Sequence, residues 1–306
     1  MRIVFFGTPQ FAVPSLESLL DLGASVVAVV TQPDRPKGRS HSSLVHPPIK
    51  VAAIHAGIPV LQPDRPTGDP FTSALTALKP DLGVVVAYGH LLRPAILAIP
   101  QRGMINVHAS LLPRWRGAAP IQWAIAHGDL NTGVTIMAME QGLDSGPMLL
   151  AKETAIGPAE TGGQLTSRLA SLGAVALHEA IERLRLGPVA AASQDDRLVT
   201  LAPKIGRKIA RIDWSLDALQ VANRIRAFDP VPGAWTTQAD SEVKCFSPIV
   251  AGPGGVPGSV LALNPLLIAA GTGSVAVGEV QPAGKGRMSA EQWIRGRSLR
   301  IGERFG

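Results

Sequence analysis

The sequence predicts an α/β fold with a parallel sheet, followed by a small antiparallel β-barrel. Three observations lead to this prediction. The chain has 306 residues, of which 46% are hydrophobic, and this is enough for two domains that each bury a core. Its first half alternates short apolar runs with amphipathic stretches, as βαβ units do. Its last third is divided by glycine and proline into short segments, which is typical of small barrels.

The alternation in the first half predicts the elements in order. Val84, Val85 and Val86 form a continuous apolar run, as in a parallel strand that helices bury on both faces. The expected strands are 2–6, 25–30, 58–61, 82–87, 104–108, 133–139 and 148–155. The expected helices are one that reaches Leu22, one near 118–127 and one at 161–186. Since open α/β sheets bind ligands at the carboxyl ends of their strands, polar residues there are candidates for a site.

The composition of the chain changes after Gly187-Pro188. A polar stretch, 193–197, and a basic stretch, 204–211, indicate a linker. A helix at 216–227 then leads into short segments such as the strand 274–280. We therefore expect the α/β domain over 1–189, the linker over 190–207 and the barrel over 208–306.

Composition excludes several classes of protein. The single cysteine, Cys245, excludes an internal disulfide and the thiolate clusters of structural zinc sites. The seven histidines show no metal-ligand spacing, so we expect no metal. No apolar run approaches the roughly 18 residues of a membrane span, and the apolar start of the chain is too short for a signal peptide. These features predict a soluble, cytoplasmic protein without a membrane partner.

Positive charge is concentrated in the last third of the chain. Residues 1–203 contain 16 basic and 15 acidic residues, whereas residues 204–306 contain 13 and 8. Such an excess is typical either of a solvated surface or of a site for a polyanion such as nucleic acid.

Asn106, His108 and Asp144 are the residues whose positions suggest chemistry. Asn106 and His108 stand two apart near the carboxyl end of an expected strand, so their side chains leave the same face. They are either hydrogen-bonded structural residues or a pair that serves one substrate. Asp144 lies in a turn after the next strand, where an aspartate either stabilises the turn or reaches the same edge of the sheet.

Two loops after expected strands differ in character. The loop that begins at Gly7 lacks the later glycines of the dinucleotide-binding fingerprint, so we do not expect NAD. The loop 31–40 is longer than most βα loops, and long loops in compact domains tend to be functional. The basic residues in and near it are Arg35, Lys37, Arg39 and Lys50. They suit either a phosphate backbone or a solvated flexible loop.

Taken together, these motifs resemble the methionyl-tRNA formyltransferase family over nearly the whole chain. The run Asn106-Val107-His108-Ala109-Ser110-Leu111-Leu112-Pro113 resembles the folate-dependent formyltransferase signature, and its continuation to Gln122 is similar to the tRNA-acting branch. Further matches are 6–9, 31–39, 86–89, 133–137, 142–144, 211–215, 281–285 and 288–290. The departures are Ala109 for the usual glycine, Gly286-Arg287 where a lysine is common, and Lys208-Ile209 where an acidic pair is usual.

The resemblance implies a Rossmann-like formyltransferase domain with a parallel sheet and an OB-like barrel that binds tRNA. It also implies 10-formyltetrahydrofolate as the donor, tetrahydrofolate as the product, and initiator methionyl-tRNA as the acceptor of a monomeric enzyme without metal. The implied catalytic residues are Asn106, His108 and Asp144. The implied folate contacts are Ser110, Leu111, Leu112, Pro113, Tyr88 and Gly89. The implied tRNA contacts are Arg35, Lys37 and Arg39.

The implied catalytic residues fit formyl transfer chemically. When an α-amine attacks the formyl carbon, the formyl oxygen gathers negative charge, and Asn106 and His108 would donate hydrogen bonds to it. Asp144 would orient His108 and help to remove the proton of the amine. A formyltransferase for an amino sugar, or a folate hydrolase, would share these residues, but neither explains the basic barrel. A non-catalytic RNA-binding protein would not need all three.

Overall fold

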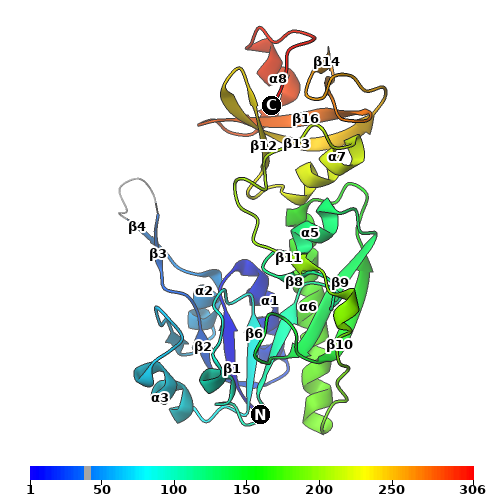
Figure 1. Ribbon diagram of the computed structural model, residues 1–306. Helices are drawn as coiled ribbons and strands as arrows, with labels where there is room; N and C mark the ends of the chain where they lie inside the picture. The colour runs from blue at the N-terminus through cyan, green and yellow to red at the C-terminus, as the bar shows by residue number, and fades with distance from the viewer. Residues whose placement is uncertain (38–42) are drawn as a thin grey trace. The chain divides into compact units, whose positions relative to one another are not determined.

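The computed structural model describes residues 1–37 and 43–306, whose elements are shown in Figure 1. Contacts divide the chain into two compact units, and neither is one continuous stretch. The first unit consists of Met1–Gly117, Thr132–Thr154 and Thr166–Leu201. The second consists of Ala118–Asn131, Ala155–Leu165 and Ala202–Gly306. The domain boundaries 1–189, 190–207 and 208–306 stay a prediction from the sequence.

A seven-stranded sheet forms the centre of the first unit. Its strands are, in spatial order, β10 (Met148–Ala155), β9 (Asn131–Ala138), β7 (Met104–His108), β6 (Leu82–Val86), β1 (Arg2–Gly7), β2 (Ser25–Val30) and β5 (Val60–Leu61). The strands from β7 to β5 are parallel, whereas β9 runs antiparallel to β7. All five residues of β6 are buried, as its valine run predicts. The α/β class is therefore confirmed, with an antiparallel neighbour on one side of the parallel strands.

Helices pack on this sheet. They are α1 (Val13–Asp21), α2 (Pro48–His55), α3 (Asp69–Ala77), α4 (Pro94–Leu97) and α6 (Gly162–Leu186), with 3-10 turns at Gln10–Ala12 and Asp196–Leu198. A Cβ added to Gly173 of α6 would lie 3.0 Å from Val107 of β7, so α6 covers the face that carries Val107. Although α6 has 25 residues, no helix within the described ranges is both long and apolar enough to cross a membrane.

The opposite face of β7 carries Asn106 and His108, the candidate site residues. Met104 belongs to a buried cluster with Phe71 of α3 and Ile96 of α4, so these helices lie over its face. Side chains alternate along a strand, and the face of Met104 therefore also carries Asn106 and His108. The last two side chains on this face of β7 are thus polar.

Two short strand pairs lie outside the main sheet. β3 (Arg35–Lys37) pairs antiparallel with β4 (Ser43–Val45), and β8 (Arg116–Gly117) pairs with β11 (Leu201–Ala202). The sequence did not indicate either pair, because strands of two or three residues are too short to show a periodicity.

Antiparallel strands form the core of the second unit. In spatial order they are β12 (Ala234–Gln238), β13 (Ser241–Ala251), β16 (Ser274–Pro282), β15 (Leu266–Ala269) and β14 (Val260–Leu263), with β17 (Met288–Ser289) beside β16. Thr237 of β12 and Gly306 exchange main-chain hydrogen bonds of 3.2 and 3.0 Å. Val260 of β14 donates to the main-chain oxygen of Glu303 at 2.8 Å. The last residues therefore join both edge strands and close the sheet into the small barrel.

Three helices complete the second unit: α5 (Pro120–Ala126), α7 (Ala218–Ala227) and α8 (Ala290–Arg295). α5 packs on α7. Arg226 of α7 is 9% exposed and donates to the main-chain oxygens of Gly157 and Glu160, both at 3.1 Å. The amide of Gly163 donates to the main-chain oxygen of Asp229 at 2.9 Å. These contacts explain why two segments that precede residue 202, namely Ala118–Asn131 and Ala155–Leu165, belong to this unit.

Candidate active site

Asn106 and His108 lie on β7 beside the ends of its neighbouring strands. Asn106 is in register with Val85 of β6 and Met137 of β9, and His108 is in register with Thr135 of β9. Asn106 is partly exposed, and its side chain makes no hydrogen bond to another described residue. Its amide is therefore available to a ligand.

The imidazole of His108 is buried and anchored. Its side chain is 6% exposed, and Nε2 lies 3.0 Å from the main-chain oxygen of Trp115. Because a carbonyl oxygen only accepts hydrogen bonds, Nε2 is the donor. The other ring nitrogen, Nδ1, lies 3.7 Å from Oδ2 of Asp144, which is longer than a direct hydrogen bond but within reach of an ion pair when the ring is protonated.

Asp144 is held at both its side chain and its backbone. It adopts a φ of 48°, a left-handed conformation that residues with a Cβ rarely adopt. Oδ2 accepts a hydrogen bond from the amide of Gly117 at 2.9 Å. The main-chain oxygen accepts from Nε2 of Gln194 at 2.8 Å. The structure thus places Asp144 beside His108. His108 in turn shares β7 with Asn106.

Gln194 is a neighbour of the site that the sequence did not indicate. It lies 50 residues beyond Asp144, in the polar stretch that we expected to be a linker. Nothing in local spacing distinguishes this glutamine from a solvated one, so only the folded chain reveals its contact with the turn of Asp144.

The loop after β7 binds its own backbone. The hydroxyl of Ser110 donates to the main-chain oxygen of Arg114 at 2.6 Å, and Ser110 is fully buried. Thr135 donates to the main-chain oxygen of Ser110 at 2.7 Å and accepts from the amide of Leu112 at 3.1 Å. Of the four expected folate contacts here, Leu111 and Pro113 are the ones that remain partly exposed.

Tyr88 and Gly89 follow the carboxyl end of β6. The main-chain oxygen of Tyr88 accepts from the hydroxyl of Thr8 at 2.9 Å and from Nε2 of Gln32 at 3.0 Å, so the ends of β1, β2 and β6 meet here. Gly89 has a φ of 86°, and a Cβ on it would lie 2.4 Å from Nε2 of Gln32. The Tyr88 hydroxyl is buried without a partner among the described residues, and burial raises its pKa to about 12.

Two of the three expected tRNA contacts, Arg35 and Lys37, lie in β3. Arg35 is exposed and donates to the side chain of Gln32. Lys37 is the last residue of β3, and Arg39 lies outside the described residues. Lys50, which the sequence placed with these cations, instead donates to Asp34 at 2.6 Å. One of the four positive charges in this region is therefore balanced within the fold.

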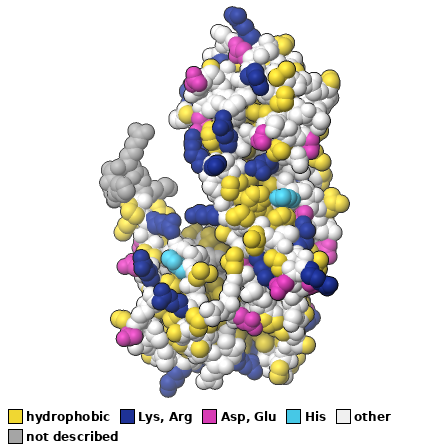
Figure 2. Space-filling view, in the orientation of Figure 1, with side chains coloured by type: hydrophobic (Ala, Val, Ile, Leu, Met, Phe, Trp, Pro, Cys, Tyr) yellow, Lys and Arg dark blue, Asp and Glu magenta, His cyan; other side chains and the backbone are white. Residues whose placement is uncertain are grey.

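A hollow of about 540 Å³ in the second unit has four basic side chains in its lining. They are Lys208, Arg211, Arg224 and Arg304. Asp213 is the one acidic side chain among the described residues that line it. Burial lowers the pKa of Arg224, which donates to the main-chain oxygen of Ile209 at 2.7 Å. In the view of Figure 2, Lys and Arg side chains also gather on one side of this unit.

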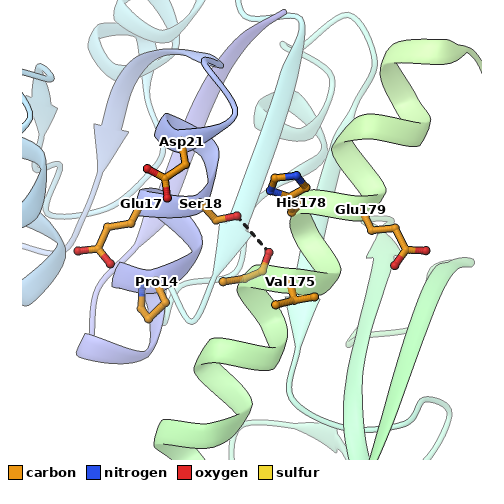
Figure 3. Close-up of a pocket in the computed structure, with 8 residues that line it drawn as sticks. Pro14, Glu17, Ser18, Asp21, Val175, His178 and Glu179 are labelled. Carbon is orange, nitrogen blue, oxygen red and sulfur yellow. Dashed lines mark hydrogen bonds between the residues drawn. The ribbon is translucent and has the colours of Figure 1, made fainter.

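A second hollow, of about 500 Å³, lies between α1 and α6 in the first unit (Figure 3). Ser18 of α1 donates to the main-chain oxygen of Ala174 at 3.2 Å, which joins the two helices. Glu179 on its rim is paired with Lys152 at 2.6 Å. In the described part of the chain, no group of three or more His, Cys, Asp or Glu side chains is placed to hold a metal ion.

Comparison with known families defines the class of this protein. A family model described as formyl transferase matches residues 1–181, which is more than half of the chain. A model described as formyl transferase, C-terminal domain, matches residues 204–298. Together with the α/β fold and the polar end of β7, these matches define a formyl transferase with both domains.

Relatives narrow this class. Methionyl-tRNA formyltransferase from Geobacter metallireducens is 44% identical over 308 residues, which cover 100% of this chain and 99% of the relative. The chain belongs to the methionyl-tRNA formyltransferase family. Relatives of the same name from Citrifermentans bemidjiense and Methylococcus capsulatus are each 46% identical, and all of this chain is covered in both cases.

Solved structures at lower identity share the fold. An N-formyltransferase from Helicobacter canadensis, in complex with folinic acid and dTDP-3-aminofucose, has a TM-score of 0.68 at 17% identity, over 90% of this chain and 98% of that one. HypX from Aquifex aeolicus, in complex with tetrahydrofolic acid, has a TM-score of 0.63 at 19% identity, over 96% of this chain. The chain spans about half of HypX, namely 47%.

Proposed function

We propose that the chain transfers the formyl group of 10-formyltetrahydrofolate to the α-amino group of initiator methionyl-tRNA, which yields N-formylmethionyl-tRNA for translation initiation. The observation that carries this proposal is the 44% identity to a methionyl-tRNA formyltransferase across nearly the whole length of both chains. Formyl transfer to methionyl-tRNA is the activity of this family. The proposal goes beyond that activity in naming the 10-formyl derivative as the donor and the initiator tRNA as the acceptor.

Asn106, His108 and Asp144 are the proposed catalytic residues. The α-amine attacks the formyl carbon, and the formyl oxygen gains negative charge. The free amide of Asn106 and the N–H at Nδ1 of protonated His108 would donate to that oxygen, because Nε2 of His108 is already held by Trp115. These donors would accelerate the reaction, because the charge that they bind develops only in the transition state.

Asp144 would serve the proton transfers. Its carboxylate faces Nδ1 of His108 at 3.7 Å and would balance the charge of the protonated ring. It would also take up the proton that the attacking amine releases, directly or through a water molecule. The leaving folate nitrogen takes up a proton as its bond to the formyl carbon breaks. The hydrogen bond from Gly117 keeps one carboxylate oxygen in place during these steps.

The ends of β6 and β7 fit a folate. Tyr88 has a buried hydroxyl without a partner among the described residues, and the absence of a side chain on Gly89 lets the backbone pack closely against Gln32. Leu111 and Pro113 add partly exposed apolar surface from the next strand's loop. The tetrahydrofolic acid in the similar HypX structure supports a donor of the folate class.

The acceptor tRNA would contact basic residues in both units. Arg35, Lys37 and Arg39 would meet it from the first unit. The second unit would attract its phosphates, since residues 204–306 contain 13 basic against 8 acidic residues. We further propose that the enzyme acts as a monomer in the cytoplasm, where its single cysteine would stay reduced.

A comparison of acceptors tests this function. The purified chain and 10-formyltetrahydrofolate are incubated with a mixed pool of aminoacylated tRNA, with free methionine, or with a nucleotide-linked amino sugar. We expect formyl transfer to methionyl-tRNA, with the initiator species preferred. Transfer to the sugar in preference to the tRNA, or release of formate without any acceptor, would show that the enzyme has one of the alternative activities.

A further inference from the structure

The side chain of Gln194 makes three hydrogen bonds around the site. Nε2 donates to the main-chain oxygens of Asp144 and Gly146, both at 2.8 Å. Oε1 accepts from Nε of Arg116 at 2.9 Å. One amide thus holds two carbonyl groups of the Asp144 turn and the residue that precedes Gly117.

The Asp144 turn benefits from such support. An aspartate adopts a φ of 48° less readily than a right-handed conformation, so contacts that hold the turn stabilise it. Gln194 holds the backbone of this turn, and Gly117 holds the carboxylate. Because Gln194 also accepts from Arg116, both supports of Asp144 are joined through β8.

The residues that follow Gln194 also reach the anchor of His108. The hydroxyl of Thr200 accepts from the amide of Trp115 at 2.8 Å, and its main-chain oxygen accepts from the amide of Arg116 at 2.9 Å. Trp115 is the residue whose carbonyl holds His108. We name residues 194–200 the strap, because this segment contacts the supports of His108 and Asp144, two of the three proposed catalytic residues.

We propose that Gln194 is a positioning residue, which sets the place of the Asp144 carboxylate relative to His108, and that two residues of the strap, Gln194 and Thr200, support the active site. This inference rests on the proposed function. Gln194 itself touches no reacting atom. Its effect is exerted through the Asp144 turn, and displacing a catalytic group by about 1 Å costs as much as 10²-fold in rate.

Two substitutions of Gln194 separate its two kinds of contact. Gln194→Met keeps the length of the side chain and removes all three hydrogen bonds. Gln194→Glu keeps an acceptor for Arg116 but removes both donors to the turn. We expect kcat to fall by about 10-fold to 100-fold in both variants. We expect the KM values for folate and methionyl-tRNA to stay unchanged, because the proposed effect of Gln194 is exerted on the Asp144 turn and not on a substrate.

Arg197→Ala in the same strap is the matched control. The Arg197 side chain is 88% exposed and, among the described residues, is hydrogen-bonded to Asp195 alone. Its kcat should equal that of the wild type. Circular dichroism melting confirms that each variant is folded, and if Gln194→Met does not fold, the Gln194→Glu variant decides.

A double substitution shows whether Gln194 acts through Asp144. If it does, adding Gln194→Met to Asp144→Asn lowers kcat no further than Asp144→Asn alone, since the group being positioned is already disabled. Suppose that Asp144→Asn alone lowers kcat. The inference is then overturned if the fold losses in kcat of the two single variants multiply in the double variant. It is also overturned if folded Gln194→Glu has the kcat of the wild type. Wild-type kcat in Asp144→Asn overturns the catalytic assignment first, and the inference with it.

Discussion

At the scale of single residues, His108 shows how the backbone assigns roles to the two nitrogens of one ring. Nε2 donates to Trp115, only seven residues along the chain, and Nδ1 is left towards Asp144. The strand position of His108 follows from the sequence. The division of its nitrogens follows from the path of the loop after β7, which brings a carbonyl group back to the ring.

Replacing His108 by alanine tests its catalytic role. We expect kcat to fall by about 10²-fold to 10³-fold, as on the loss of one oxyanion donor, because the residue is proposed to bind charge that exists only in the transition state. The KM for methionyl-tRNA should change little. Steady-state kinetics on a variant with an unchanged melting curve measure both values. An unaltered kcat would remove His108 from the mechanism.

Asp34 illustrates a charge balanced inside the first unit. Hydrogen bonds from Lys50, Gln62 and His46 at 2.6, 2.8 and 2.8 Å lower its pKa to about 2, with that from Lys50 as the main cause. In an unfolded chain the pKa of an aspartate is about 3.9. Because folding lowers the pKa of Asp34, its carboxylate stabilises the folded state fully at pH values above about 3.9. This stabilisation is lost as the pH falls through about 2.

The pH dependence of stability therefore tests the Asp34 cluster. We expect Asp34→Asn to melt at a lower temperature than the wild type at neutral pH. The difference should shrink as the pH falls from about 4 to 2, because the wild type then loses the same interaction by protonation. Melting curves at a series of pH values measure this. A gap that is constant across the series would contradict the assignment of this charge.

At the scale of elements, β9 shows why one glycine of a strand is required. A Cβ on Gly133 would lie 2.2 Å from the main-chain oxygen of Lys152 in β10 and 2.6 Å from Leu111. The sequence shows a glycine at the start of an apolar strand. Only the neighbouring strand and loop show that the backbone leaves no space for a side chain there.

Gly133→Ala should consequently destabilise the first unit. The two strands must move apart to admit the methyl group, at a cost of about 1 to 3 kcal/mol, typical of overpacking. Gly206→Ala is the control, since no described atom lies within 4 Å of a Cβ at that position. Thermal denaturation of both variants provides the comparison. Equal melting temperatures for the two would refute the steric argument.

At the scale of the whole molecule, chain order and compact units do not coincide. α5 and the segment Ala155–Leu165 precede the barrel by many residues, yet both belong to the second unit with α7. A fragment that ends near residue 203 therefore keeps α5 without the helix on which it packs. The contribution of the basic second unit to tRNA binding is therefore better tested on the full chain.

Salt dependence reports whether the second unit holds tRNA phosphates. Substituting Lys208 and Arg304 by glutamine in the hollow should weaken tRNA binding. The slope of log affinity against log salt should become shallower by about one for each phosphate that the variant no longer neutralises. Folate binding should be unaffected. Arg197→Ala, which removes an exposed charge elsewhere, should leave the slope unchanged. An unchanged slope in the double variant would place the phosphate-binding residues elsewhere.

The sequence by itself determined the α/β class, the succession of the main strands along the chain, the family, and the shared face of Asn106 and His108. These depend on local patterns: apolar runs, alternation along one strand, and a contiguous motif. Strands of two or three residues, such as β8 and β11, are too short to show such a pattern.

The tertiary structure decided which groups near the site are free and which are engaged. It pairs Lys50 with Asp34, occupies one nitrogen of His108, brings Gln194 to the Asp144 turn, and closes the barrel with its last residues. Each of these depends on hydrogen bonds to main-chain or side-chain atoms that only the path of the folded chain brings within about 3 Å. No local spacing encodes such a path, because the distance between two distant residues is set by the packing of everything between them.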